Sequence, residues 1–472
     1  MPYYILDLLE ELDAEGEYWL DRTRGTLSFW PPSNLNATVA EISTCCNAKT
    51  VRGVVGVPLV SLTNVSAFAF ENIALGPGRG QGVDCKNCTD VSLSNLTVSN
   101  FNGMGITVSG GHNVTVSRVT VRDVGDAGVV VEGGDRERLL PSGHSVVDCD
   151  IGHFARWRTT AAPGIKMGGC GITAAHNEIH HAAHHGIEVW GNDMVMEGND
   201  IHHVVLQTYD SGAIDNGFSG VTSGDLTWRG CRVTRNRFHS LGDEANYPLS
   251  PAQAKLARIQ TAVYLDDHVS GWTVDHNIIA SVNMGAFIHF GRDNDFHHNL
   301  FLEAGLAVAF EDCNCCNHCT EDGMCDKHLQ LLNETRRWPA WPEYLARYPG
   351  LRNLTFPCQG WNNSLRSNAF VASSGVSQQW STNTTLPVKW GEPPSCQSPA
   401  SNFETASVAQ AGFVSADPLG SLDFRLKNGS PVWAATGWTE QLPAQFGPRP
   451  LKADDSCFDA GGAPHSPCAQ QK

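Results

Sequence analysis

A short segment with one apolar residue at a constant place recurs along the first two thirds of the chain. The segments are ENIAL, SNLTV, SRVTV, CDIGH, NEIHH, NDIHH, NRFHS, NIIAS and NLFLE, and their shared apolar column is Ile73, Leu96, Val119, Ile151, Ile179, Ile201, Phe238, Ile279 and Phe301. Successive members are 23, 23, 32, 28, 22, 37, 41 and 22 residues apart. A step of 22 or 23 residues suits one coil of three short strands and their turns, so the repeat predicts a right-handed parallel β-helix whose longer coils carry inserted loops.

Composition agrees with an all-β solenoid and excludes several classes of function. The 472 residues include 47 glycines, which favour many tight turns over long helices. A formal charge of −17, with no basic block, argues against nucleic acid as a partner. Composition also argues against membrane spans, and we expect a monomer.

The repeat covers only part of the chain, and five regions are expected. They are an N-terminal hairpin and cap region (1–60), the β-helix (61–310), a Cys-rich loop and helical insertion (311–364), a final coil with a C-terminal cap (365–435) and an extended tail (436–472). The hairpin is predicted in EYWLDRTRGTLSFWPP. In the insertion, EDCNCCNHCTEDGMC lacks paired Cys-x2-Cys knuckles with spaced histidines, which favours disulfides over zinc.

Cysteine and asparagine motifs indicate the secretory route. The chain has 16 cysteines, and Asn-X-Ser/Thr triplets begin at Asn36, Asn64, Asn87, Asn95, Asn113, Asn333, Asn353, Asn362, Asn383 and Asn428. Secretion or residence in the secretory lumen is therefore expected. The first residues, MPYYILDLLEELDAEGEYWL, carry acids where a signal peptide needs an apolar core, so no signal peptide is visible.

Two polar columns accompany the apolar one. Asn177, Asn199, Asn236, Asn277 and Asn299 predict an inward ladder in which each amide bonds the next. Histidines follow the apolar column by one residue (His180, His202, His239) and by two (His181, His203). A hydrogen-bonded imidazole stack is favoured for them over a transition-metal site.

Counting from these columns locates acidic residues on one outward face. Glu188 lies nine residues after Ile179, and Asp210 lies nine after Ile201. Glu188 also precedes Asn199 by eleven residues, as Asp266 precedes Asn277. Ungapped counting therefore predicts one column of Glu188, Asp210 and Asp266, with Asp267 beside it and loops at 211–230 and 241–260 walling a cleft.

Stacked carboxylates repel, so such a column requires an explanation. One is a general acid paired with a base or nucleophile, the acid having a pKa raised by its neighbours. The second is a Ca²⁺ site; the third is that the register slips and the acids merely cap turns. The candidate catalytic residues are Asp210, Asp266, Asp267 and Glu188; the candidate substrate-binding residues are His184, His185, Lys166, His289 and Arg292. No cofactor is expected, with Ca²⁺ as the alternative.

Several longer motifs resemble a known family. CGITAAHNEIHHAAHHGIEVWGNDMVMEGNDIHHVVLQTYDSGAI, AVYLDDHVSGWTVDHNII and GAFIHFGRDNDFHHNLF, with DSGA and YLDD the most specific pieces, resemble the right-handed β-helix family that includes glycoside hydrolase family 141. The likeness covers roughly residues 15–310 and 365–435. It implies an enzyme that hydrolyses α-L-fucosidic or xylan linkages, with a catalytic pair at Asp210 and at Asp266 or Asp267. Where relatives usually read DSGAIY, this chain has Asp215.

Residues and resemblance together predict a glycoside hydrolase that acts on a cell-wall or extracellular polysaccharide or oligosaccharide. One alternative is a polysaccharide lyase or epimerase, which needs a cation for the uronate carboxylate. Lys166 and Arg292 are its candidates. A second alternative is a β-helix that binds glycans without catalysis.

Overall fold

The structure, a computed structural model, describes most of the chain. The described residues are 8–15, 17–21, 23–31, 57–217, 224–242, 259–311, 324–354, 362–373, 376–378 and 401–450. Two compact units divide the chain, Met1–Cys45 and Cys46–Lys472. In the first, η1 (Leu9–Glu11) precedes strands β1 (Tyr18–Asp21) and β2 (Thr26–Phe29), which pair antiparallel and confirm the predicted hairpin.

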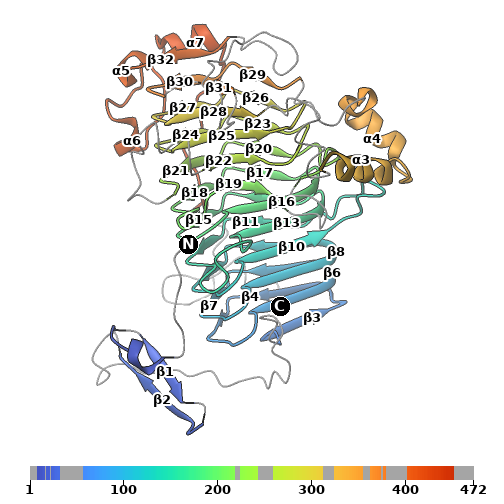
Figure 1. Ribbon diagram of the computed structural model, residues 1–472, viewed down its shortest axis with the longest axis vertical. Helices are drawn as coiled ribbons and strands as arrows, with labels where there is room; N and C mark the ends of the chain where they lie inside the picture. The colour runs from blue at the N-terminus through green and yellow to red at the C-terminus, as the bar shows by residue number, and fades with distance from the viewer. Residues whose placement is uncertain are drawn as a thin grey trace, which may run out of the picture. The chain divides into compact units, whose positions relative to one another are not determined.

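The second unit is a parallel β-helix in which each complete coil contributes one strand to each of three stacks (Figure 1). Stack 1 contains β3 (Val60–Thr63), the first part of β6 (Val83–Ser94) and of β8 (Ile106–Ser117), β10 (Val129–Gly133), β13 (Ile165–Cys170), β16 (Ile187–Asn192), β19 (Ser211–Asn216), β22 (Gln260–Leu265), β25 (Met284–His289), β28 (Leu306–Glu311) and β31 (Val376–Gln378). Stack 2 contains β4 (Ser66–Glu71), the remainder of β6 and β8, β11 (Ser145–Val147), β14 (Thr173–Ala175), β17 (Val195–Glu197), β20 (Arg232–Thr234), β23 (Thr273–Asp275), β26 (Asp295–His297) and β29 (Ser364–Arg366). Stack 3 contains β5 (Ala74–Leu75), β7 (Thr97–Ser99), β9 (Thr120–Arg122), β12 (Asp150–Gly152), β15 (Glu178–His180), β18 (Asp200–His202), β21 (Arg237–His239), β24 (Ile278–Ala280), β27 (Leu300–Leu302), β30 (Ala369–Val371) and β32 (Phe403–Thr405).

The predicted apolar column is correct from the fourth segment onward. Ile151, Ile179, Ile201, Phe238, Ile279 and Phe301 are paired in succession in stack 3 and face the core. In the first three segments the prediction was wrong by two residues, because Leu75, Val98 and Val121 occupy this column instead of Ile73, Leu96 and Val119. A shift of two residues keeps the same face of a strand, so the apolar pattern alone does not distinguish the two registers.

The asparagine ladder is confirmed. Asn177, Asn199, Asn236, Asn277, Asn299 and Asn368 are fully buried. The Oδ1 atom of Asn236, for example, accepts from both the backbone N–H and the Nδ2 of Asn199 at 2.9 Å, while its own Nδ2 donates to the Met196 carbonyl. Each amide thus satisfies backbone groups at a corner of the coil, where strand pairing is interrupted.

A helical insertion follows β28 and confirms that part of the expectation. It contains α3 (Met324–Thr335), α4 (Trp341–Arg347) and η4 (Pro349–Asn353), and α3 and α4 lie together beside the stack of coils in Figure 1. Five of the insertion's cysteines, at positions 313, 315, 316, 319 and 358, lie outside the described residues, so their pairing stays a prediction. Within the β-helix, Cys85, Cys88, Cys149, Cys170 and Cys231 are buried free thiols.

The C-terminal segment covers part of the outer surface of stack 3. Its short helices α5 (Val408–Ala411), α6 (Pro418–Ser421) and α7 (Pro431–Thr436) lie beside the last coils in Figure 1. Phe413, Leu426 and Trp438 pack in one cluster with Leu300 and Val371, whose side chains alternate with the inward column. Across the described part of the chain, no helix is both long and apolar enough to cross a membrane.

Candidate functional site

A column of polar and aromatic side chains crosses the outer face of stack 1. Lys166 pairs with Glu188, Glu188 pairs with Asp215, and Tyr264 pairs with Phe287 in successive strands. The pairing of Ile214 with Val263 places Tyr264 next to Asp215. The intervening residues, such as Ile187, Ile214 and Val263, belong to the core, so the members of this column point outward.

Counting without gaps gave the wrong acids for this column. Glu188 is correctly placed, but Asp215 occupies the position predicted for Asp210, and Tyr264 occupies the position predicted for Asp266. Ile214 lies 13 residues after Ile201, whereas its paired equivalent Ile187 lies 8 after Ile179, so five residues are added there. Asn277 lies 13 residues after Tyr264, whereas Asn199 lies 11 after Glu188, so two more are added. The expected loop at 211–230 is also wrong in its first part, because residues 211–216 form β19.

Glu188 is held by a lysine. The Lys166 Nζ lies 2.8 Å from Glu188 Oε1, and the glutamate side chain is 5% exposed. Lys166 and Glu188 were predicted to bind substrate and to act in catalysis, but they form an ion pair across adjacent strands. Removing either partner would leave an uncompensated buried charge.

Asp215 is the acid whose surroundings most favour its protonated form. It is 4% exposed. Burial raises its pKa well above the ordinary range, and the nearby charges of Asp266 and Glu188 raise it further. The backbone N–H of Gly212 donates to Asp215 Oδ2 at 2.8 Å, and His185 Nδ1 lies 3.3 Å from the same oxygen. Burial also lowers the pKa of His185, to about 4, so its imidazole is neutral at pH 7.

Tyr264 connects Asp215 with the remaining acids. Its hydroxyl donates to Asp210 Oδ1 at 2.9 Å. Its pKa is raised well above its usual value by burial and then by the charges of Asp266, Asp210 and Asp215. The phenol therefore lies among three carboxyl groups, and Asp210, an exposed residue, belongs to the same site although it lies in a different column.

Asp266 and His289 form the second half of the site. His289 Nδ1 lies 2.5 Å from Asp266 Oδ1 and 3.8 Å from Asp267 Oδ1. The backbone N–H of Asp267 donates to Asp266 Oδ1, and the backbone N–H of Asp266 donates to Asn216 Oδ1. The Asp266 side chain is 19% exposed and is therefore open to a ligand, whereas Asp267 is buried.

Segments from outside stack 1 cover this face. Gly224 approaches so closely that a Cβ atom there would lie 2.4 Å from the Asp266 carbonyl oxygen and 2.3 Å from that of Asp267. His328 of α3 is 1% exposed, and its ring centroid lies 4.2 Å from that of His268. Burial lowers the pKa of His328 to about 4, with Asp225 and Asp266 acting in the opposite direction. The insertion therefore contributes an imidazole near Asp266.

Two of the predicted substrate-binding residues have other partners. His184 Nδ1 accepts from the backbone N–H of Ala161 at 3.2 Å, and its ring centroid lies 3.5 Å from that of His185. Burial lowers the pKa of His184 to about 3. Arg292 lies 3.7 Å from Asp293 through its Nε, and its backbone N–H donates to Ser270 Oγ.

Oxygen and nitrogen atoms suited to a metal ion occur at one place in the site. Asp266, Asp267 and His289 have ligand atoms within 4.8 Å of one another. The set predicted for Ca²⁺ was Glu188, Asp210 and Asp266, and these three do not share a column. Two carboxylates and an imidazole suit a transition metal better than Ca²⁺, which prefers oxygen ligands throughout.

Sequence reasoning missed Asp215, Tyr264 and His328 as members of the site. Asp215 directly follows an apolar residue at the end of SGAID, which is a strand pattern. Tyr264 is two residues before Asp266, the spacing of side chains on one face of a strand. No sequence signal places His328 here, because its helix is joined to the β-helix through residues far from Asp266 in the chain.

Among comparisons with known proteins, the match to a family model supports the architecture. A family model described as a right handed beta helix region matches residues 105–323. A solved structure named glycoside hydrolase is 18% identical, over 42% of this chain and 35% of that chain, with a TM-score of 0.34. This chain thus spans about a third of that structure's length. None of the curated proteins matches the sequence. The chain is an all-β protein built as a right-handed parallel β-helix.

Proposed function

We propose that this protein is a glycoside hydrolase in which Asp215 is the general acid and Asp266 is its partner. The observation that carries the proposal is the contrast between these two carboxyl groups on one face of stack 1. Asp215 is buried with a raised pKa, whereas Asp266 is partly exposed and lies 2.5 Å from His289. Pairs of carboxyl groups with different environments are how enzymes assign acid and base roles at neutral pH.

In the proposed reaction Asp215 gives its proton to the glycosidic oxygen as the bond to the anomeric carbon breaks. Asp266 removes a proton from the attacking water, and His289 keeps Asp266 in position. Strand spacing of about 4.8 Å and a rise of about 3.3 Å per residue put the two backbone positions about 8 Å apart. We propose that the two carboxyl groups keep a similar separation, within the range of about 6.5–9.5 Å found in inverting enzymes, and therefore that the anomeric centre is inverted.

The substrate we propose is a neutral cell-wall glycan of the fucoside or xylan type. Lys166 is paired with Glu188, and Arg292 contacts Asp293, so these two cations have carboxylate partners within the protein. A lyase or epimerase would need such a cation to neutralise a uronate. Tyr209, an exposed aromatic residue beside Asp210, is suited to packing against a sugar ring.

The test compares the parent with Asp215→Asn and Asp266→Asn on xylan and fucosylated oligosaccharides, following reducing ends and the anomer formed by NMR. Glu197→Gln, a change in stack 2 on the same coil as Glu188, is the control and should retain activity. Both aspartate variants should lose at least about 100-fold in kcat, the usual contribution of an acid or base. Glycan binding without any turnover by the parent would refute catalysis, and an unsaturated product absorbing in the ultraviolet would indicate a lyase instead.

We also propose that the protein passes through the secretory pathway. The asparagines of the triplets at Asn64, Asn87, Asn95 and Asn113 are exposed and have positive φ in the first coils, so an attached oligosaccharide would project into solvent. Protein made in a eukaryotic secretory host should lose mass on enzymatic deglycosylation. An unchanged mass would contradict this route.

A further inference from the structure

Two columns of imidazoles run side by side at the corner that follows stack 3, away from the proposed catalytic face. In the first column His153, His181 and His203 stack with ring centroids 4.9 and 4.8 Å apart. In the second, His180, His202 and His239 stack at 5.3 and 4.8 Å. Parallel coils repeat the same corner, so each histidine has an equivalent one coil away.

The two columns face each other through the same ring atom. His180 Nδ1 lies 2.7 Å from His181 Nδ1, and His202 Nδ1 lies 2.7 Å from His203 Nδ1. Between two neutral rings such a contact is a hydrogen bond in which one Nδ1 donates its proton. The other Nδ1 accepts that proton through its lone pair. The 2.7 Å pair therefore repeats on two successive coils, whose stacked rings lie 4.8 and 5.3 Å apart.

Carboxylates orient the second column from behind. His180 Nε2 lies 3.0 Å from Asp150 Oδ1, and His202 Nε2 lies 3.2 Å from Glu178 Oε1. An imidazole whose Nε2–H donates to a carboxylate presents an unprotonated Nδ1, and this is the arrangement that supports histidine ligands of metal ions. It occurs here on two coils in succession, independently of the stacking itself.

We infer that His180, His181, His202 and His203 form a binding site for one first-row divalent metal ion such as Zn²⁺. The Nδ1 or Nε2 atoms of His181, His202 and His203 already lie within 4.8 Å of one another, and His153, His180 and His181 form an adjoining set. Tetrahedral Zn²⁺ with Zn–N distances of about 2.0–2.1 Å places its nitrogen ligands about 3.3 Å apart. Binding therefore requires the 2.7 Å pairs to open and the stacked rings of the two coils, now 4.8 and 5.3 Å apart, to tilt towards each other. On binding, the Nδ1 protons of His181 and His203 transfer through solvent to the Nε2 atoms of the same rings, so that both coordinate as neutral imidazoles.

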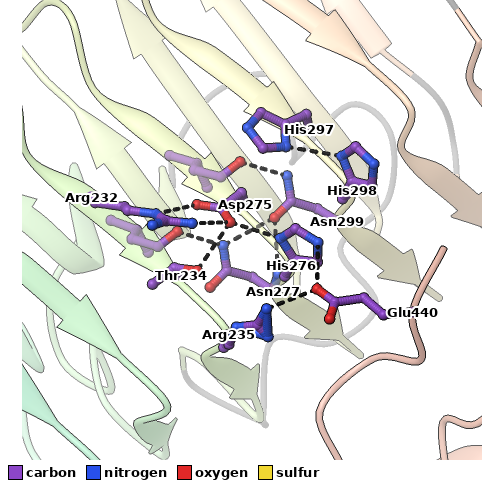
Figure 2. A network of polar contacts seen from close by, with 12 residues as sticks. Arg232, Thr234, Arg235, Asp275, His276, Asn277, His297, His298, Asn299 and Glu440 are labelled. Atoms are coloured by element: carbon purple, nitrogen blue, oxygen red, sulfur yellow. Dashed lines mark hydrogen bonds and ion pairs between the residues drawn. The ribbon is translucent and has the colours of Figure 1, made fainter. Parts of the chain in front are cut away.

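A third group, Asp275, His276 and His297, also has ligand atoms within 4.8 Å of one another, but it differs in its hydrogen-bond partners (Figure 2). His276 places Nδ1 2.7 Å from Asp275 Oδ2 and Nε2 3.3 Å from Glu440 Oε1, so both of its ring nitrogens have carboxylate partners. Asp275 in turn receives two hydrogen bonds from Arg232, at 2.9 and 2.8 Å. This network ties stack 2 to the C-terminal segment and has its polar atoms occupied by protein.

The proposed metal site and the His276 group allow variants that remove the same number of histidines from each. His181, His203, His276 and His298 all have positive φ values, between 50° and 58°, which asparagine tolerates better than alanine does. His181→Asn with His203→Asn removes one column of the proposed site. His276→Asn with His298→Asn removes as many stacked imidazoles from the His276 group and serves as the control.

The experiment titrates the metal-free full-length protein with ZnCl₂ by calorimetry and measures the thermal unfolding temperature with and without Zn²⁺. The parent should bind one ion at this site and unfold at a higher temperature, because the ion links two coils. The His181/His203 variant should bind at least about tenfold more weakly, as should Asp150→Asn, while the control binds as the parent does. X-ray absorption should show nitrogen or oxygen neighbours at about 2.0–2.1 Å.

Three results would overturn the inference. They are no Zn²⁺ uptake by the parent, equal binding by the His181/His203 variant, and sulfur neighbours at about 2.3 Å, which would place the ion on cysteines. None of these readouts depends on hydrolysis, so the metal site and the proposed catalytic function succeed or fail separately.

Discussion

Replacing Asp215 with asparagine should stabilise the protein at neutral pH while it abolishes turnover. Asparagine keeps the size of the side chain, and its Oδ1 can still accept from the Gly212 backbone N–H, which donates to Asp215 at 2.8 Å. What the variant removes is a carboxyl group whose pKa burial and the charges of Asp266 and Glu188 raise well above its ordinary value. The catalytic loss and the gain in stability have the same cause.

The magnitude follows from linkage between protonation and folding. In the unfolded chain the Asp215 carboxyl has a pKa of about 3.9, whereas its folded pKa is raised well above that value. The stabilising effect of a raised pKa is fully present below the unfolded pKa and is lost as the pH rises towards the folded pKa. Between these limits the folded state holds one proton more, so the parent loses about 1.4 kcal/mol of stability per pH unit relative to Asp215→Asn. From pH 5 to pH 6 the variant should therefore gain about 1.4 kcal/mol on the parent.

The assay is urea unfolding of both proteins at pH 5, 6 and 7, followed by intrinsic fluorescence, with kcat measured on the same preparations. The slope m of unfolding free energy against urea concentration should agree between the two proteins, so that their urea midpoints report the difference in stability. A stability difference that stays constant between pH 5 and pH 6, or that grows in favour of the parent, would show that Asp215 is ionised in the folded protein. The same result would remove it as the general acid.

Three further changes test other parts of the structure. Asn236→Ala should lower the free energy of unfolding by at least about 3 kcal/mol, because it removes hydrogen bonds from the buried Asn199 N–H, Asn199 Nδ2 and Met196 carbonyl. A loss below about 1 kcal/mol in urea unfolding would contradict this. Lys166→Met should lower the free energy of unfolding by about 3–5 kcal/mol, because it leaves Glu188 buried without its partner. Adding Glu188→Gln should restore most of that loss. Equal stability of the single and double variants would refute the pairing. Gly224→Ala should displace the covering segment and lower kcat/KM, whereas Gly429→Ala, where a Cβ meets nothing within 4 Å, should be neutral; unchanged kinetics for Gly224→Ala would show that the cover does not shape the site.

The amino-acid sequence determined the architecture because every coil of a solenoid needs apolar residues at equivalent positions, so the sequence repeats with the period of one coil. Each coil must bury the same face, so Ile179, Ile201 and Ile279 recur at equivalent places and pair in the structure. The buried amide ladder was predictable for the same reason: a polar residue repeated beside a core column lies next to its own equivalents on the neighbouring coils and can hydrogen-bond with them. The outward direction of Glu188 followed from strand alternation.

The site itself depended on features that a period does not encode. Five additional residues between Ile201 and Ile214, and two between Tyr264 and Asn277, put Asp215 and Tyr264 in the column of Glu188 without disturbing the core columns. Burial of Asp215 requires covering segments, whose position depends on packing at long range. The sequence by itself determined which face carries the acids, and only the tertiary structure decided which carboxyl group is desolvated and holds a proton, because desolvation depends on everything packed around it.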